Sequence, residues 1–156
     1  MEIHATNDFA ASVPTVFAML TDRVFLRAVC LATDPLEHEV WVDGLRTATR
    51  RVMPTPSVVS RLAGPKMAVV DEITWSPDGN GDGRSGAAHI TVEGMPAELV
   101  GTVTLLPGGR GSVLTYAGEL TVRIPVLGPG LAKQAAPLLL EALEIQQRVG
   151  DEFLAR

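Results

Sequence analysis

Six polar side chains stand on segments that otherwise alternate apolar and polar residues, and their types could serve one binding site. They are His38, Thr47, Thr49, Arg51, Asp71 and Tyr116. A buried polar group needs a partner, so these six either satisfy one another, lie at wet strand ends, or face a ligand. A mostly apolar cavity with a few convergent polar groups is typical of a small-molecule site. We predict that they line such a site together with three apolar side chains: Met67, Leu139 and Leu143.

The polar candidates differ in what they can do chemically. Arg51 is suited to a carboxylate, which its guanidinium can hold with two hydrogen bonds, and His38, Thr49 and Tyr116 can orient a polar head group. The residue types of His38 and Asp71 also suit proton transfer near neutral pH. Their spacing does not place them within hydrogen-bond reach of each other, and no nucleophile stands in a recognised motif. We therefore assign no catalytic residue.

Two further features resemble metal and thiol sites only in part. Residues 78–83 match the first six positions of a calcium-binding loop, but the twelfth position, which should be a glutamate, is His89. Asparagine, aspartate and glycine are equally the composition of a hairpin loop. The single cysteine, Cys30, has no disulfide partner and lies on the apolar face of a predicted helix, as an inert buried thiol does. We expect no metal and no cofactor.

The segments that would position these residues begin with a strand and two short helices. Residues Glu2–Phe9 alternate in polarity, which predicts a half-buried strand. Ser12 is placed to cap a first helix, with Pro14 tolerated in its first turn. Asp22 is placed to cap a second helix directly afterwards.

Six further strands are predicted, at residues 36–42, 45–52, 67–75, 86–93, 97–106 and 112–124. Asp43-Gly44 is a dipeptide that favours a two-residue hairpin turn, which would set Val42 opposite Leu45. Alternation along this hairpin puts its polar candidates on the concave face of the sheet and Trp41 on the solvent face. Residues 56–62 are expected to form one helical turn between strands.

The last segment, residues 131–154, predicts a long helix whose apolar stripe includes Leu139 and Leu143. Pro137 either kinks this helix or marks its true first turn. Strands joined by hairpins form a curved antiparallel sheet with one wet face, and the terminal helix is the natural cover for the other. The expected class is therefore α+β, with about seven strands wrapped around the terminal helix in one domain, residues 1–156.

Charge and composition exclude several classes of function. The net charge is −5, and the 13 basic residues are scattered rather than clustered, which argues against nucleic acid as a partner. The chain is 46% hydrophobic but only 4% aromatic. No window approaches the run of about 18 apolar residues that a membrane span needs, and the first residues lack the features of a signal peptide. We expect a cytoplasmic protein without stable membrane insertion, and its oligomeric state stays open.

Several motifs together resemble the START-like superfamily, also called SRPBCC or helix-grip proteins. The opening that carries the likeness is Ile3-His4-Ala5-Thr6 followed by the residues from Ala11 to Asp22. A narrower likeness, to an actinobacterial branch of unknown function, rests on segments 36–40, 72–75 and 101–105 and on the ending, Gln146-Gln147-Arg148 with Leu154. The resemblance covers essentially the whole chain and includes no catalytic signature. One departure is the compact Asp43-Gly44 hairpin, where a longer loop is expected.

The resemblance implies a helix-grip fold that holds lipids or other hydrophobic molecules between its sheet and terminal helix. Our first hypothesis is accordingly a non-enzymatic carrier or sensor of a hydrophobic small molecule or lipid. The alternative, which also exists in the superfamily, is a cyclase, dehydratase or hydrolase that uses the same cavity. A third possibility is an interaction module whose core is filled by its own side chains.

Overall fold

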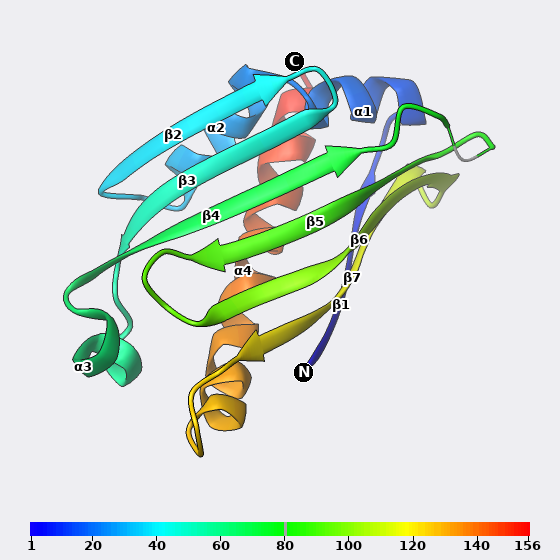
Figure 1. Cartoon of the computed structure of the whole chain (residues 1–156). Coiled ribbons are helices and arrows are strands. Elements are labelled where there is room, and N and C mark those ends of the chain that lie inside the picture. The colour runs from blue at the N-terminus through cyan, green and yellow to red at the C-terminus, as the bar shows by residue number, and fades with distance from the viewer. Residues whose placement is uncertain (80) are drawn as a thin grey trace.

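A curved antiparallel sheet of seven strands, counted over the described residues 1–79 and 81–156 of the computed structural model, wraps around a long helix (Figure 1). The strands are β1 (Glu2–Phe9), β2 (Glu37–Asp43), β3 (Arg46–Pro54), β4 (Lys66–Trp75), β5 (Arg84–Val92), β6 (Ala97–Gly108) and β7 (Gly111–Val122). Their order is β1-β7-β6-β5-β4-β3-β2, so β2 to β7 form a meander and β1 pairs with its last strand. The predicted α+β class is confirmed.

Two short helices follow β1, each capped as the sequence predicts. In α1 (Val13–Leu20), the Ser12 hydroxyl accepts from the backbone N–H of Thr15 at 3.5 Å. In α2 (Arg23–Ala32), the Asp22 carboxylate accepts from the backbone N–H of Val24 at 2.8 Å. A 3₁₀ turn, η1 (Ser57–Val59), and the four-residue helix α3 (Ser60–Ala63) form the predicted helical turn between β3 and β4.

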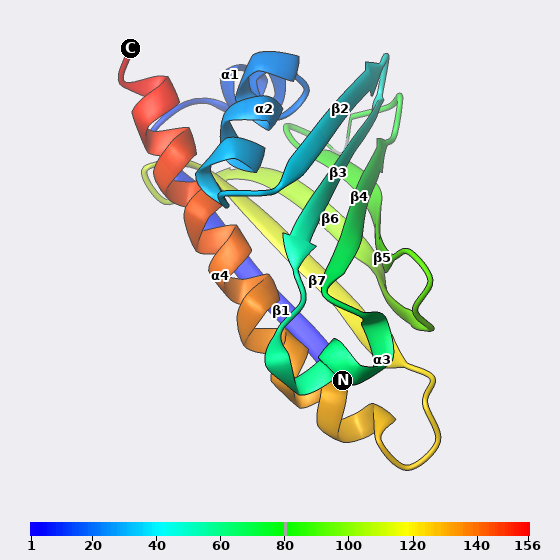
Figure 2. The ribbon, with the colours of Figure 1, turned by 90° about the vertical axis from the view of Figure 1, so that its left-hand side faces the viewer.

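The terminal helix α4 (Gly128–Leu154) crosses the concave face of the sheet (Figure 2). It begins before the predicted first residue, with Pro129 in its first turn, where a missing N–H costs no hydrogen bond. Pro137 lies inside the helix. The alternative prediction, that Pro137 marks the first turn of this helix, is therefore wrong.

The turn of the first hairpin differs from the prediction by one residue. Its two central residues are Gly44 and Leu45, not Asp43 and Gly44, so that Val42 pairs with Thr47. Gly44 has φ of +59°, a left-handed conformation that glycine adopts without strain and that a type II′ turn requires at this position. The pairing thereby slips by an even number of residues, so every side chain keeps its predicted face of the sheet.

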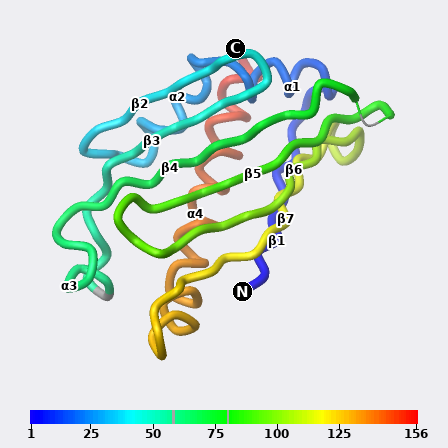
Figure 3. Tube along the Cα trace, viewed as in Figure 1, coloured from blue at the N-terminus to red at the C-terminus, as the bar shows by residue number. Residues whose placement is uncertain are grey.

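Two separate hydrophobic clusters lie between the sheet and its helices. The larger one surrounds Phe9, Phe25 and Trp75 beneath α1, α2 and the last turns of α4, and we call this the closed end. The smaller one joins Ile3 to Ala132 and Ala136 in the first turns of α4, and we call this the open end. The N-terminus lies toward the open end and the C-terminus at the closed end (Figure 3).

Across the ranges that the structure describes, no helix is long and apolar enough to cross a membrane.

Candidate ligand cavity

Two adjoining hollows lie between the concave face of the sheet and α4. The inner chamber, of about 100 Å³, is enclosed by β3 to β7, α2 and α4. The outer chamber, of about 410 Å³, extends to the surface at the open end. Six residues line both chambers and form what we call the neck: Thr33, Arg51, Ile90, Leu99, Leu139 and Ala142. The two hollows can therefore be treated as one cavity with an inner and an outer part.

The walls of both chambers are mainly aliphatic. Ile73 from the sheet and Leu143 from α4 line the inner chamber, and Met67, Val92 and Leu138 line the outer one. Aromatic rings are scarce, since Tyr116 is the aromatic residue among the side chains that line the two chambers. These walls offer apolar area to a ligand but few rings on which a planar ligand could stack.

A pair of glycines lets the backbone itself form part of the inner wall. Gly101 on β6 pairs with Gly118 on β7. A Cβ atom on Gly101 would overlap the carbonyl oxygen of Ala117 and the Cα of Gly118. The two strands can approach this closely only without side chains there, which leaves backbone atoms of β7 exposed to the chamber.

The structure brings most of the predicted site residues together. Those at the inner chamber are Thr47, Thr49, Arg51, Asp71, Tyr116, Leu139 and Leu143, and Met67 lies at the outer chamber. Alternation along the strands put the strand residues on the concave face, and the apolar stripe of α4 put Leu139 and Leu143 opposite them. That they bind a ligand stays a prediction.

His38 is the exception, because it lines neither chamber. It lies half-buried on β2, the edge strand, and pairs in register with Arg51. Helix α2 packs against β2, so the hollow begins only at the next strand, β3. The prediction that His38 lines the cavity is wrong, although it lies on the predicted face of the sheet.

The electrostatic centre of the inner chamber is Asp71. Burial raises the pKa of its carboxyl group to about 6, although the nearby charge of Arg51 acts in the opposite direction. Burial, together with the negative charge of Asp71, also raises the pKa of the Tyr116 hydroxyl, which therefore stays protonated. Burial raises the pKa of the Cys30 thiol as well. Cys30 is thus unsuited to act as a nucleophile, as the sequence predicts.

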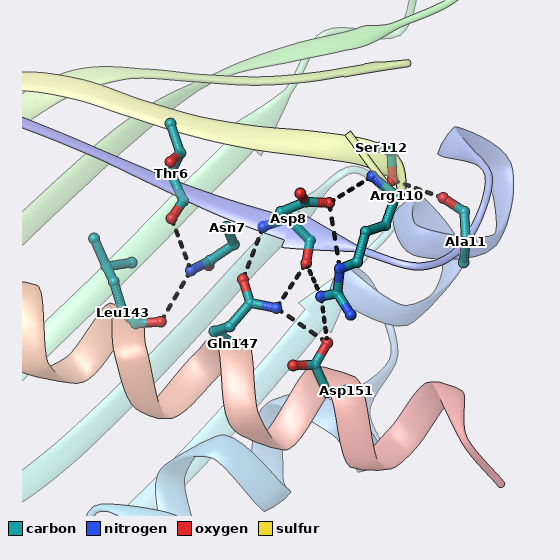
Figure 4. Close-up of polar contacts among 9 residues, drawn as sticks. All are labelled: Thr6, Asn7, Asp8, Ala11, Arg110, Ser112, Leu143, Gln147 and Asp151. Atoms are coloured by element: carbon teal, nitrogen blue, oxygen red, sulfur yellow. Dashed lines mark hydrogen bonds and ion pairs between the residues drawn. The ribbon is translucent and has the colours of Figure 1, made fainter. Parts of the chain in front are cut away.

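Gln146 adds a polar side chain to the inner chamber, and it and its buried partner Asn7 were missed from the sequence. The Gln146 amide on α4 donates to the Tyr116 hydroxyl oxygen at 3.1 Å and to the Asn7 side chain at 2.9 Å. Asn7 in turn donates to the carbonyl of Leu143 at 3.1 Å (Figure 4). The available signal was Asn7 itself, a polar residue on the apolar face of β1 that had to find a partner.

Several polar groups in the inner chamber have no protein partner. Within the described part of the chain, the side chains of Thr47, Arg51 and Asp71 make no hydrogen bond or ion pair. The Tyr116 hydroxyl accepts a hydrogen bond from Gln146 and donates none there. Buried polar groups are normally satisfied. These groups therefore need water or the polar group of a ligand.

His, Cys, Asp and Glu side chains are the usual protein ligands of metal ions. In the two ranges that the structure describes, no group of three or more His, Cys, Asp or Glu residues could hold an ion. Asn80, the third position of the calcium-like loop at 78–83, lies outside those ranges.

Comparison with known sequences gives one family and several curated relatives. A family model described as "Protein of unknown function (DUF2505)" matches residues 4–154. The uncharacterized protein Rv0481c of Mycobacterium tuberculosis is 32% identical over 95 residues, which cover 60% of this chain and 54% of that protein. The uncharacterized protein Mb0491c of Mycobacterium bovis matches to the same extent. The match thus spans about half the length of these curated relatives.

Solved structures share the fold over nearly the whole chain. TTHA0849 of Thermus thermophilus has a TM-score of 0.64 at 21% identity, covering 97% of this chain and 95% of that one. A STAR-related lipid transfer protein of Xanthomonas axonopodis has a TM-score of 0.62 at 16% identity, covering 99% and 86%. A START superfamily protein of Mycobacterium smegmatis has a TM-score of 0.61 at 17% identity, covering 98% of each chain. The predicted START-like, helix-grip fold is confirmed.

Proposed function

We propose that this chain, which belongs to the DUF2505 family, binds a hydrophobic small molecule or lipid in the two chambers and acts as a carrier or sensor rather than an enzyme. The observation that supports this most is the outer chamber, about 410 Å³ of space with mainly aliphatic walls. Ligand sites are typically concave and mostly apolar, and the opening of this chamber to the surface gives a ligand a way in. A volume of this size falls in the range of small-molecule pockets.

The arrangement of the walls supports one orientation of the ligand. The apolar part would lie in the outer chamber against Met67 and Leu138, where each buried Å² of apolar surface contributes roughly 25 cal/mol. The polar part would pass the neck beside Arg51 and meet Asp71 and Tyr116. The lipid transfer protein among the structures of similar fold fits this proposal in general terms.

An enzymatic role in the same chambers is the alternative. Asp71 and Tyr116 are close enough for the charge of one to affect the pKa of the other, so a hydrophobic substrate would meet an ionisable pair. The raised pKa of Tyr116 keeps this hydroxyl protonated, which suits it to donate a hydrogen bond rather than to act as a base. The carrier hypothesis needs no reaction and is preferred.

Binding can be tested by blocking the neck. We expect the purified protein to bind a fluorescent probe of apolar sites, to release it when dodecan-1-ol is added, and to retain co-purified lipid in native mass spectrometry. Ala142→Phe places a ring in the neck and should abolish probe binding. Leu140→Phe is the control, because Leu140 lies on the same helix and lines neither chamber. Undiminished binding by Ala142→Phe, or none by the wild type, would contradict the proposal.

A further inference from the structure

Two opposite charges face the inner chamber without pairing with each other. Arg51 lies on β3 and Asp71 on β4, where their direct partners in the sheet are Val69 and Thr49. The two residues are therefore diagonal neighbours on one face. Among the ion pairs of the described chain, none joins them. Each charge is thus left facing space that a ligand could occupy.

The hydrogen-bonding capacity of these groups selects what that ligand can offer. An ionised Asp71 only accepts hydrogen bonds, whereas Arg51 only donates them and the Tyr116 hydroxyl has one donor free. A hydroxyl group both donates and accepts, so it can satisfy Asp71 and one of the donors at once. A carboxylate only accepts, so it would satisfy Arg51 but leave Asp71 unpaired.

The charges around the inner chamber also favour a hydroxyl over a carboxylate. The ionisable groups around Asp71 are Arg51 from β3, Cys30 from α2, Tyr116 from β7 and, beside it on its own strand, Glu72. Helix α4 contributes only neutral side chains to the inner chamber, and β5 contributes Ala88 and Ile90. With Cys30 and Tyr116 protonated, the chamber holds one positive and one negative charge. An anionic ligand would add a second negative charge in a place with little water, where like charges repel strongly.

We propose that Asp71 makes the chamber selective for a neutral amphiphile with a hydroxyl head, and against the carboxylate with the same hydrocarbon chain. This inference rests on the proposed function and names the class of ligand for the same site. It also assigns Asp71, rather than Arg51 alone, as the residue that sets specificity. Arg51 by itself would favour the opposite ligand.

The matched pair dodecan-1-ol and dodecanoate tests this selectivity, by displacement of the apolar-site probe at about pH 7.5 and below the micelle concentration. We expect the wild type to bind the alcohol roughly tenfold or more tightly than the acid, because of the like-charge repulsion. Asp71→Asn should strengthen dodecanoate binding by about the same factor and reverse or remove the preference. Glu72→Gln is the control, because it removes the same charge at the next residue, which faces the opposite side of the sheet and pairs with Arg46.

Each outcome decides the matter. Equal binding of the two ligands by the wild type, or an unchanged ratio in Asp71→Asn, would overturn the selectivity while leaving the proposed function intact. A shift of the same size in Glu72→Gln would also overturn it, because the effect would then come from overall charge. Binding of neither ligand nor probe by the wild type would instead overturn the proposed function, and the selectivity with it.

Discussion

The closed and open ends of this molecule are built from the same sheet and the same helix but are filled differently. The closed end contains every phenylalanine of the chain and one of its two tryptophans, with Phe17 packed edge-on to Trp75 at 5.2 Å and Phe25 to Phe153 at 5.6 Å. The open end is built from aliphatic and small residues around Leu99. Apart from Tyr116, which lines the inner chamber, and the exposed Trp41, the aromatic rings of this sequence thus lie where the interior is filled.

The hydrogen bonds that join β1, the β6–β7 turn and α4 contrast with the surroundings of Asp71, although Trp75 Nε1 at the closed end is also buried without a partner among the described residues. At the closed end, the Gln147 amide donates to the Asp8 carbonyl at 2.7 Å and to Asp151 at 3.0 Å, and Arg110 donates to both of these acidic residues (Figure 4). These bonds tie β1, the β6–β7 turn and α4 together. In the inner chamber, by comparison, Asp71 makes no such bond in the described part of the chain. The contacts of Gln147 hold β1 and α4 together at the closed end, which fits the proposal that a ligand lies in the chambers and not there.

The largest effect on stability is expected from truncating one buried side chain at the closed end, compared with one at the neck. Phe9 is fully buried at the closed end, and Phe9→Ala should cost about 3–5 kcal/mol in the free energy of unfolding. Ile90→Ala, at the neck, should cost about 2 kcal/mol or less, because its side chain already faces empty space. Urea unfolding measures both. Equal costs would mean that the neck is packed as tightly as the closed end, and the comparison would fail.

The next effect is a dependence of stability on pH that arises from Asp71. Its pKa of about 6 in the folded protein lies above the ordinary 3.8, so the folded state binds this proton more tightly than the unfolded state. The contribution of Asp71 to stability therefore falls as the pH rises from about 4 to above 6, by up to about 3 kcal/mol. Asp71→Asn should be more stable than the wild type near pH 7.5 and similar near pH 4, as measured by urea unfolding. A difference that does not vary with pH would contradict this.

A third prediction enlarges two small residues of α4, Gly150 at the closed end and Ala142 at the neck. Gly150→Ala would normally stabilise a helix by about 1 kcal/mol, but the new Cβ would overlap the ring of Phe9. We expect a net loss of about 1–3 kcal/mol. Ala142→Leu, which extends into the neck, should be neutral or slightly stabilising. Thermal unfolding shows whether each variant is more or less stable than the wild type. A more stable Gly150→Ala would mean that the closed end can accommodate a methyl group at this position.

The smallest effect belongs to the convex surface of the sheet. Arg46 and Glu72 form an exposed ion pair at 2.9 Å, and exposed pairs contribute about 0–1 kcal/mol. Glu72→Gln should change the free energy of unfolding by less than about 1 kcal/mol in low salt, and by less still in high salt. A larger change would mean that stability depends on the convex face more than on the closed end.

Much of this arrangement could be predicted from the sequence, because strand alternation alone decides which face a residue occupies. Alternation predicts Asp71 and Tyr116 in the concave lining, where both lie. The turn of the first hairpin differs from the prediction, but the pairing shifts by an even number of residues and each side chain stays on its predicted face. The predictions that failed concern which residues from different elements lie close together in the folded chain. His38 is on the right face but lies on the edge strand that α2 covers, and the pairing of Asn7 with Gln146 joins residues far apart in the chain.

The central claim, that the open end holds a ligand in a cavity of its own, is tested most directly by a crystal structure of the protein with dodecan-1-ol. We predict continuous ligand density through the neck, with the hydroxyl within hydrogen-bond distance of Asp71 and the hydrocarbon chain between Met67 and Leu138. The side chains of the closed end should be unchanged. Chambers occupied instead by the protein's own side chains, with the alcohol absent or bound elsewhere, would contradict the claim.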